Sequence, residues 1–429
     1  MLNNSVLNYY SNDNIDNINY NAKYDFKGEC YNSLYPNLHK YPATMLPQIG
    51  LELLKEFKAK KTNLLGPYCG SGSSFSSGLE YGIKEFVGFD LNPLAILISN
   101  AKLNYIETDI LNKEKDKIKN KIIKKNYNSN YEILKSKILN NIKNIDFWIE
   151  KKTQEDLIFI YSVIESIKNK PNIKNIFLLA FSETLREASY TRNNEFKLFR
   201  MQNYQNYKPD AFSIFAQKLD SIVENYLNIY KPKLKNISFH LYNSSFIPSN
   251  IMFDNILTSP PYGDSKTTVA YGQFSTFINE WLGFENARKL DSILMGGKKV
   301  KNLYTKGIIK KYIFEIEKID KKRAFEVSSF YFDLEKSIKS LINSINIKGL
   351  SFFVVGNRRV KNIELPTDKF IAQLFEENNF KHITTIERKI SNKAMPIRNS
   401  PTNKIGILSN TINKEYIIVC QKNKEILLL

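Results

Sequence analysis

The sequence has few of the residues that build disulfide frameworks and metal centres. It contains three cysteines and three histidines in 429 residues. Cys30, Cys69 and Cys420 are too few and too scattered for a disulfide framework or a zinc site, and the histidines do not cluster either. We therefore expect no metal in the functional site, and we expect the chain to work in a reducing cytoplasm.

Long apolar runs are also missing. No window holds the run of about 18 apolar residues that a membrane-spanning helix needs. The segment Met1-Leu2-Asn3-Asn4-Ser5 lacks the basic-then-apolar pattern of a secretion signal. Neither membrane insertion nor secretion is expected from these patterns.

Acidic residues are outnumbered by basic ones. The sequence has 62 Lys+Arg and 43 Asp+Glu, which gives a net charge of +19 and an isoelectric point near 9.4. Such a balance favours a polyanionic partner, either nucleic acid or an anionic membrane surface, and the lack of membrane segments favours nucleic acid. Part of the excess serves solubility alone, since lysine is abundant throughout the chain.

Strand and helix patterns alternate in two parts of the chain. The first part contains a strand at 63–65, a Gly-rich turn at 66–74, a helix at 75–81 and a strand at 85–89. The pattern resumes with strands at 237–241, 253–258 and 349–355, a helix at 367–377, and strands near 382–387 and 415–420. This alternation predicts an α/β fold with a doubly wound, mostly parallel, Rossmann-like sheet.

The segments between these patterns suggest how the chain is divided. Residues 103–235 form a long, mostly helical stretch that is dense in lysine between 113 and 143. We predict four parts: a loosely ordered segment at 1–36, a cofactor-binding half at 37–102, a helical insertion at 103–235, and a catalytic half at 236–429 with an irregular basic insertion at 263–325. The helical insertion is the candidate for target recognition.

The Gly-rich turn is the candidate cofactor site. Gly70 and Gly72 let the backbone approach a ligand closely, and Asp90 ends the next strand, where such folds place an acid on ribose hydroxyls. Any nucleoside cofactor would satisfy this pattern, including a dinucleotide, and a plain tight turn is the structural alternative. No Gly-Lys-Ser/Thr follows, so the pattern does not favour hydrolysis of a nucleoside triphosphate.

The second candidate is Ser259-Pro260-Pro261-Tyr262, which follows a predicted buried strand. Two prolines have no backbone donors and restrict the preceding residues to extended conformations, so the loop is stiff and its carbonyl oxygens are free to accept. A hydroxyl before the prolines and a ring after them complete a slot for a flat, amino-bearing group such as an extruded nucleobase. A rigid turn with a packed tyrosine is the structural alternative.

Together these two segments resemble the amino-methylating DNA methyltransferases that use S-adenosylmethionine. The family's Gly-rich motif, Asp-Pro-Phe-x-Gly-Ser-Gly-Thr, stands here as Gly66-Pro67-Tyr68-Cys69-Gly70-Ser71-Gly72-Ser73, and its catalytic Asn/Asp/Ser-Pro-Pro-Tyr/Phe/Trp as Ser259-Pro260-Pro261-Tyr262. Residues 40–47 look like the family's further cofactor motif. The resemblance implies a Rossmann-like methyltransferase fold, double-stranded DNA as the substrate, and a restriction endonuclease as functional partner.

The resemblance also implies roles for individual residues. The residues it assigns to binding S-adenosylmethionine are Tyr41, Pro42, Pro67, Cys69, Gly70, Ser71, Gly72, Ser73, Asp90, Asn92 and Pro93. The residues it assigns to catalysis are Ser259, Pro260, Pro261 and Tyr262. Gly66 departs from the family, which has an acid at that position, and a non-catalytic DNA-binding relative is therefore one alternative.

The target base can be narrowed. Methylation at cytosine C5 would need a cysteine nucleophile after a proline, and none of the three cysteines follows a proline. An exocyclic amine remains, and resemblance favours cytosine N4 because serine at the first motif position is typical there. Adenine N6 is the alternative, and an RNA or protein-amide methyltransferase could use a similar proline loop.

Four further segments carry weaker signals for contact with the target. They are polar, basic or aromatic, and for each an ordinary structural role is at least as good an interpretation; they span residues 181–194, 267–274, 356–359 and 393–403.

Overall fold

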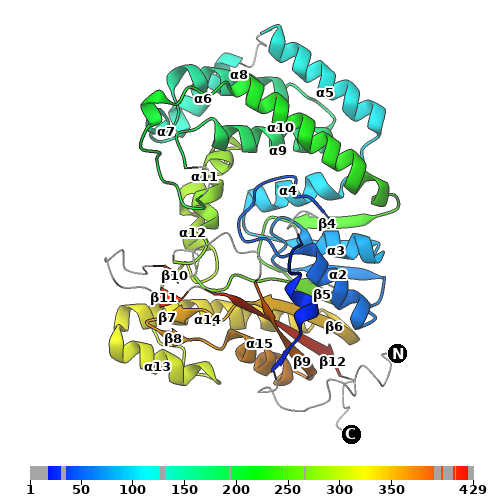
Figure 1. Ribbon diagram of the computed structural model, residues 1–429, viewed down its shortest axis with the longest axis vertical. Helices are drawn as coiled ribbons and strands as arrows, with labels where there is room; N and C mark the ends of the chain where they lie inside the picture. The colour runs from blue at the N-terminus through cyan, green and yellow to red at the C-terminus, as the bar shows by residue number, and fades with distance from the viewer. Residues whose placement is uncertain are drawn as a thin grey trace.

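The protein consists of an α/β lobe and a helical lobe (Figure 1). The structure, a computed structural model, describes residues 18–29, 35–125, 131–192, 195–248, 250–264, 267–390, 398–399, 409–410 and 412–423. Among the helices in these ranges, none has both the length and the apolar character needed to cross a membrane.

One eight-stranded sheet forms the centre of the α/β lobe. Its strands, in spatial order, are β1 (Ile18–Tyr20), β9 (Phe380–Lys389), β12 (Lys414–Lys422), β6 (Ile345–Val355), β5 (Phe253–Thr258), β2 (Asn63–Gly66), β3 (Glu85–Phe89) and β4 (Ser238–Tyr242). β12 runs antiparallel to both of its neighbours, and the other pairs are parallel. The predicted fold class, doubly wound and mostly parallel, is confirmed.

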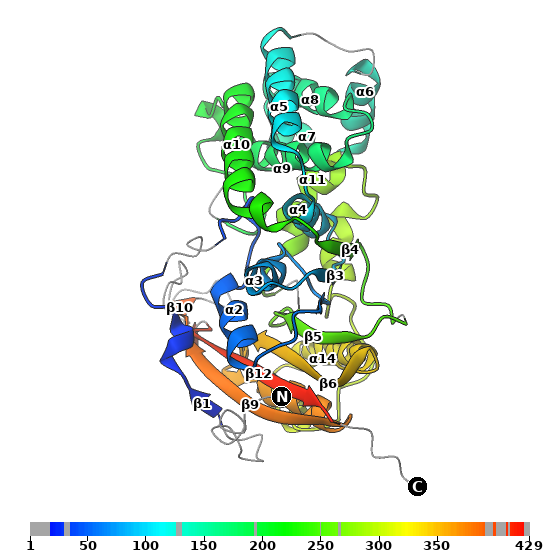
Figure 2. The same ribbon diagram turned by 90° about the vertical axis from the view of Figure 1, so that its right-hand side faces the viewer.

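Helices cover both faces of the sheet, which explains why its central strands are apolar without alternation. One face packs on α2 (Pro47–Glu56), α3 (Ser73–Tyr81) and α4 (Pro93–Leu103), and the other on α13 (Ile309–Ile319), α14 (Lys321–Ile342) and α15 (Thr367–Glu376). Neighbouring residues divide between the two faces: Leu64 belongs to the first core and Leu65 to the second. Figure 2 shows the strands following one another from β1 at the lower left to β4 at the upper right.

The helical lobe is formed by helices that lie between α4 and β4 in the sequence. It contains α5 (Thr108–Ile123), α6 (Tyr131–Asn141), α7 (Ile145–Trp148), α8 (Lys151–Glu165), α9 (Pro171–Glu187) and α10 (Ala211–Asn225). One helix of the later sequence, α11 (Tyr271–Trp281), packs against it. The Trp281 ring lies 5.2 Å from the ring of Phe181 and 5.8 Å from that of Tyr161. The helical lobe is therefore anchored to the α/β lobe by a segment that follows the Ser-Pro-Pro-Tyr loop.

The remaining elements are short. They are the helical turns η1 (Ala22–Asp25), η2 (Tyr204–Asn206), η3 (Tyr226–Tyr230), η4 (Lys231–Lys233), η5 (Ala287–Lys289) and α12 (Leu290–Ile293), and the hairpins β7 (Arg359–Val360) with β8 (Ile363–Glu364) and β10 (Arg398–Asn399) with β11 (Ser409–Asn410).

One expectation about an irregular segment was wrong. Residues 263–325 are not an irregular insertion, because they contain α11, η5, α12, α13 and the start of α14. Within the segment 1–36, β1 pairs in parallel with β9, and Tyr24 is fully buried with its hydroxyl on Glu56 at 2.9 Å. Pairing with the sheet edge therefore orders residues 18–20, while residues 1–17 and 30–34 of the predicted segment lie outside the described part of the chain.

Candidate active site

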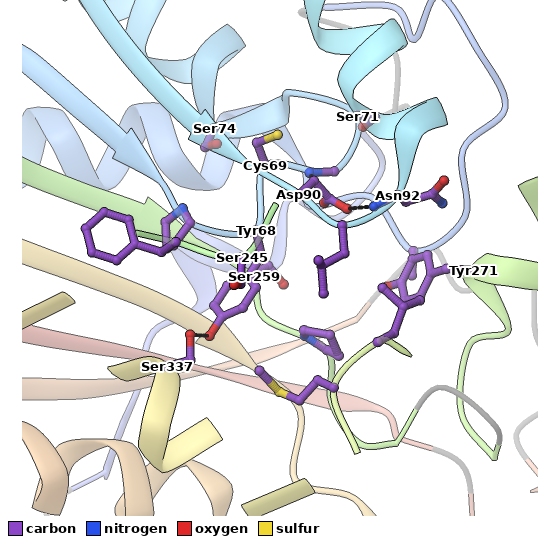
Figure 3. A pocket seen from close by; sticks show the side chains of 18 of the residues that line it. Tyr68, Cys69, Ser71, Ser74, Asp90, Asn92, Ser245, Ser259, Tyr271 and Ser337 are labelled. Atoms are coloured by element: carbon purple, nitrogen blue, oxygen red, sulfur yellow. Dashed lines mark hydrogen bonds between the residues drawn. The ribbon is translucent and has the colours of Figure 1, made fainter. Parts of the chain in front are cut away.

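A cavity of about 480 Å³ lies where the carboxyl ends of β2, β3, β4 and β5 meet. Figure 3 shows side chains from these four strand ends and from α14 around it. Ten of the residues predicted to act in the site line it: Tyr41, Pro67, Cys69, Gly70, Ser71, Ser73, Asp90, Asn92, Ser259 and Pro261. The other five lie next to lining residues in the chain: Pro42, Gly72, Pro93, Pro260 and Tyr262.

The Gly-rich turn has a backbone that other residues would adopt only with strain. Gly70 and Gly72 have φ of 50° and 78°, in the left-handed region that glycine accepts without penalty. Gly72 is also the N-cap of α3 and makes no side-chain cap, so the first amides of the helix are available to a ligand. Ser73 Oγ is buried and has no hydrogen-bond partner within the described part of the chain. A polar ligand in this cavity would satisfy that hydroxyl.

Asp90 is tied to the Gly-rich turn from the next strand. Its carboxylate accepts hydrogen bonds from Gly70 N at 2.9 Å and Asn92 N at 2.8 Å. Burial raises the pKa of Asp90 to about 6, although both of these hydrogen bonds lower it. The carboxylate therefore titrates close to neutral pH, and its remaining lone pairs can accept from the hydroxyls of a ligand.

The segment at 40–47 closes the site from a third direction. The Tyr41 hydroxyl accepts a hydrogen bond from Asn92 Nδ2 at 3.0 Å, and the Tyr41 ring stacks on Tyr271 with centroids 5.8 Å apart. Thr44 Oγ1 lies 3.4 Å from Ser71 Oγ. The structure thus brings this segment against the Gly-rich turn and Asp90, three parts of the chain that sequence alone places only in order.

The Ser-Pro-Pro-Tyr loop forms the opposite wall. Ser259 Oγ donates to Tyr262 Oη at 3.3 Å, and Tyr262 Oη donates to Glu415 Oε1 at 2.8 Å. Burial, with the added effect of the Glu415 charge, raises the pKa of Tyr262 well above its usual range, so its hydroxyl keeps its proton. Behind the ring, a β-carbon built on Gly356 would lie only 2.7 Å from Tyr262 Cδ2. The tyrosine is therefore held at both its hydroxyl and its ring.

A buried ion pair supports the loop immediately after Tyr262. Arg358 Nη1 donates to Asp264 Oδ2 at 2.6 Å, and Arg323 Nη2 approaches the same oxygen at 3.5 Å. The two partners of the pair, Asp264 and Arg358, are 2% and 8% exposed. In the segment 356–359, which the sequence offered for contact with the target, the guanidinium of Arg358 is committed to this buried pair, and Arg359 is paired with Glu364 at 2.6 Å.

One face of α14 lines the cavity and was not predicted. It presents Asp333, Lys336, Ser337 and Ser340, and the Tyr68 hydroxyl donates to Ser337 Oγ across the cavity edge, as Figure 3 shows. Asp333 adds a second carboxylate to the wall, so the cavity is not without acids although Gly66 replaces the expected one. The three- and four-residue spacing of these polar residues is a helical face, and that periodicity is the signal that could have found them.

The other segments that carried weaker signals for contact with the target lie in different parts of the structure. In the segment 267–274, residues 271–274 begin α11, and Tyr271 lines the cavity. The segment 181–194 belongs to α9 and the loop after it, although residues 193 and 194 lie outside the described residues. Most of the loop 393–403 also lies outside them, so its predicted contact with DNA stays a prediction.

The sequence was compared with known proteins. No protein-family model matches it. The chain is 37% identical over 423 residues to the type II methyltransferase M.MvaI of Kocuria varians, and the alignment covers 89% of each protein. An alignment of this length necessarily includes most of the helical lobe as well as the sheet, so the similarity is not confined to the cofactor-binding core.

Proposed function

The chain belongs to the type II methyltransferases, the DNA methyltransferases of restriction–modification systems, and on that premise we propose that it methylates an exocyclic base amine in DNA, with cytosine N4 the favoured target. One observation carries the proposal: Ser259 and the Gly-rich turn line the same cavity. A base amine bound to Ser259 and a methyl donor bound to the Gly-rich turn would therefore meet in one cavity, which is the arrangement that direct transfer between two bound groups requires.

The cavity fits S-adenosylmethionine as the methyl donor. Its volume of about 480 Å³ falls within the range of roughly 300–1,000 Å³ that is usual for small-molecule sites. We assign the ribose hydroxyls to Asp90 and the polar end of the cofactor to the amides and hydroxyls of the Gly-rich turn. When bound, the cofactor supplies an electrophilic methyl group on a sulfonium.

The residues of the Ser-Pro-Pro-Tyr loop would activate and hold the target amine. The lone pair of a base amine is delocalised into the ring, which makes the nitrogen a poor nucleophile. Hydrogen bonds from its two N–H groups to Ser259 Oγ and the Pro260 carbonyl would favour a pyramidal nitrogen and localise that pair. The Tyr262 ring would stack on the extruded base. The new N–C bond would form as the bond between the methyl carbon and the sulfonium sulfur breaks, with its electron pair kept on sulfur; one N–H proton would leave to solvent, and no covalent enzyme intermediate is needed.

The cysteines give no support to methylation at carbon. Cys69 lines the cavity but belongs to the Gly-rich turn, and burial raises the pKa of its thiol well above the ordinary value. Cys420 is fully buried in β12, and Cys30 lies outside the described residues. The leading serine of the loop favours cytosine N4 by resemblance, and adenine N6 remains the second candidate.

We assign target recognition to the helical lobe, in particular to the loop between α9 and α10. There the guanidinium carbon of Arg200 lies 3.3 Å from the ring centroid of Tyr204 and 4.2 Å from that of Phe147. Phe196 and Phe199 are 39% and 46% exposed in the same loop. Exposed rings beside a stacked arginine suit contact with bases and phosphates. The functional partner would be an endonuclease that cleaves the same DNA sequence when it is unmethylated.

Incubation with unmethylated double-stranded DNA and methyl-labelled S-adenosylmethionine tests the proposal. After digestion to nucleosides, mass spectrometry should find N4-methylcytosine, and N6-methyladenine would identify the second candidate. Ser259→Ala should abolish the label. Label in RNA or protein only, or 5-methylcytosine as the product, would overturn the proposal. DNA binding without cofactor binding by calorimetry would identify a non-catalytic relative.

A further inference from the structure

Tyr262 connects the loop of the proposed site to a buried ion pair between β12 and β9, on the side of the sheet beyond β6. Glu415 is the second residue of β12 and Arg388 lies near the end of β9, directly opposite it in the antiparallel register. Arg388 Nη1 donates to Glu415 Oε2, and Arg388 Nε donates to the backbone oxygen of Tyr24 at 2.6 Å. The Arg388 side chain is 3% exposed and that of Glu415 is 15% exposed. The carboxylate is therefore held in one position.

The chemistry of these groups gives the hydrogen bonds one direction. Arg388 can only donate and an ionised Glu415 can only accept. Tyr262 therefore donates its single hydroxyl hydrogen to Glu415 Oε1, at 2.8 Å, and its oxygen can only accept the hydrogen bond from Ser259. Ser259 in turn donates its hydroxyl hydrogen to Tyr262, over a long contact of 3.3 Å. Only lone pairs of the Ser259 oxygen are then left on the cavity side.

We propose that Glu415, held by Arg388, sets the direction of this hydrogen-bond chain so that Ser259 can only accept from a base in the cavity. The inference rests on the proposed function and deepens it, since it names Glu415 as a positioning residue that touches neither cofactor nor base. A serine that can only accept pairs with an amino group and leaves a carbonyl oxygen unsatisfied. This chain of hydrogen bonds thus favours cytosine and adenine, whose edges carry an amine, over thymine.

Glu415→Gln would reverse the direction of these hydrogen bonds while the side chain keeps nearly the same size and shape. The amide oxygen must face Arg388, because two donors would otherwise oppose each other. The amide NH₂ then faces Tyr262, whose oxygen accepts from it and whose hydrogen turns to Ser259. Ser259 in consequence directs its own hydrogen into the cavity, toward the N–H groups of the target amine. A buried donor that faces a donor should slow methyl transfer about 10-fold to 100-fold, which corresponds to roughly 1.4–2.7 kcal/mol at about 1.36 kcal/mol per tenfold.

The experiment is a set of single-turnover rates on a short duplex that contains the methylated site found with the wild-type protein. Glu415→Gln should methylate about 10-fold to 100-fold more slowly, with unchanged affinity for S-adenosylmethionine by calorimetry. Tyr262→Phe keeps the ring and breaks the chain, so adding Glu415→Gln to it should cause no further loss. Glu387→Gln is the matched control: Glu387 lies on the same strand pair and binds Lys414 at 2.7 Å instead. Its rate should equal that of the wild type.

A second readout separates positioning from a general structural role. A duplex with a carbonyl base at the target position should bind the wild type more weakly than the amino base, and Glu415→Gln should narrow or invert this preference. The inference is overturned if Glu415→Gln keeps the wild-type rate, or if its loss persists in full beside Tyr262→Phe. If Glu415→Gln does not fold, Tyr262→Phe decides on the duplex with the carbonyl base: it frees the Ser259 hydroxyl to donate, so an unchanged preference for the amino base refutes the inference. A wild-type protein that methylates no base amine refutes the proposed function instead.

Discussion

Gly356→Ala should slow methyl transfer although Gly356 does not line the cavity. Gly356 follows β6 directly, and a β-carbon on it would lie 2.7 Å from Tyr262 Cδ2, 3.1 Å from Tyr262 Cε2 and 2.8 Å from Ile412 Cγ2. Its backbone φ is not in the left-handed region, so alanine costs nothing in conformation. The perturbation is therefore a steric one that acts on the Tyr262 ring.

The displacement can be worked out from these distances. An ordinary carbon–carbon contact is about 3.5 Å, so the ring must retreat by roughly 0.8 Å from a β-carbon at 2.7 Å. The ring cannot simply slide away, because its hydroxyl is bound to Glu415. Overpacking of this kind costs roughly 1–3 kcal/mol of stability. A shift of about 1 Å in a group that positions a reactant costs on the order of 100-fold in rate.

The assay is the single-turnover rate with saturating cofactor, measured beside the affinity for S-adenosylmethionine and the free energy of unfolding in urea. Gly349→Ala is the matched control, since a β-carbon there would lie 2.7 Å from Ile345 Cγ2 in the same strand but far from Tyr262. Both variants should lose similar stability, and only Gly356→Ala should lose rate. A Gly356→Ala rate within about threefold of the wild type, or an equal loss in both variants, would refute the reasoning.

Three further predictions follow from the site and the lobe contact. The pKa of Asp90 is raised to about 6, so cofactor affinity measured by calorimetry should fall about tenfold as the pH drops from 7 to 5 and the carboxylate becomes protonated. Asp90→Asn should bind the cofactor weakly at every pH. A wild-type affinity that does not change over this pH range would contradict the assignment of Asp90 to the cofactor. Asp264→Asn leaves the Arg358 charge buried without its ionic partner, so urea unfolding should show a loss of roughly 3–5 kcal/mol, and a loss below 1 kcal/mol would contradict this. Trp281→Ala removes the ring that packs between the lobes, so DNA affinity in a gel-shift titration should fall while cofactor affinity stays unchanged. A DNA affinity equal to that of the wild type would contradict the assignment of target recognition to the helical lobe.

The parts of the site that sequence predicts are those built by contiguous residues. The Gly-rich turn and the Ser-Pro-Pro-Tyr loop each follow a strand, and their backbone chemistry depends on neighbours in the chain. Since β2 and β5 are adjacent parallel strands, these two loops meet at one edge of the sheet. The alternation of strands and helices was enough to predict that edge, and similarity to a type II methyltransferase supports the same family.

Other parts of the site depend on contacts between residues far apart in the chain. Tyr262 and Glu415 are 153 residues apart, and they meet only because β12 inserts between β6 and β9 in the antiparallel direction. No local pattern reports that insertion. The same holds for α11, whose Trp281 joins the lobe formed by earlier sequence.

The amino-acid sequence alone therefore determined the fold class, the two strand-end loops and the chemistry that they offer, because turns, prolines and apolar strands act over a few residues. The tertiary structure decided which distant side chains orient those loops: Glu415 and Arg388 behind Tyr262, Asp264 and Arg358 behind the loop, and the polar face of α14. The physical reason is that a hydrogen bond or an ion pair depends on separation in space, and only the packed sheet converts positions in the chain into such separations.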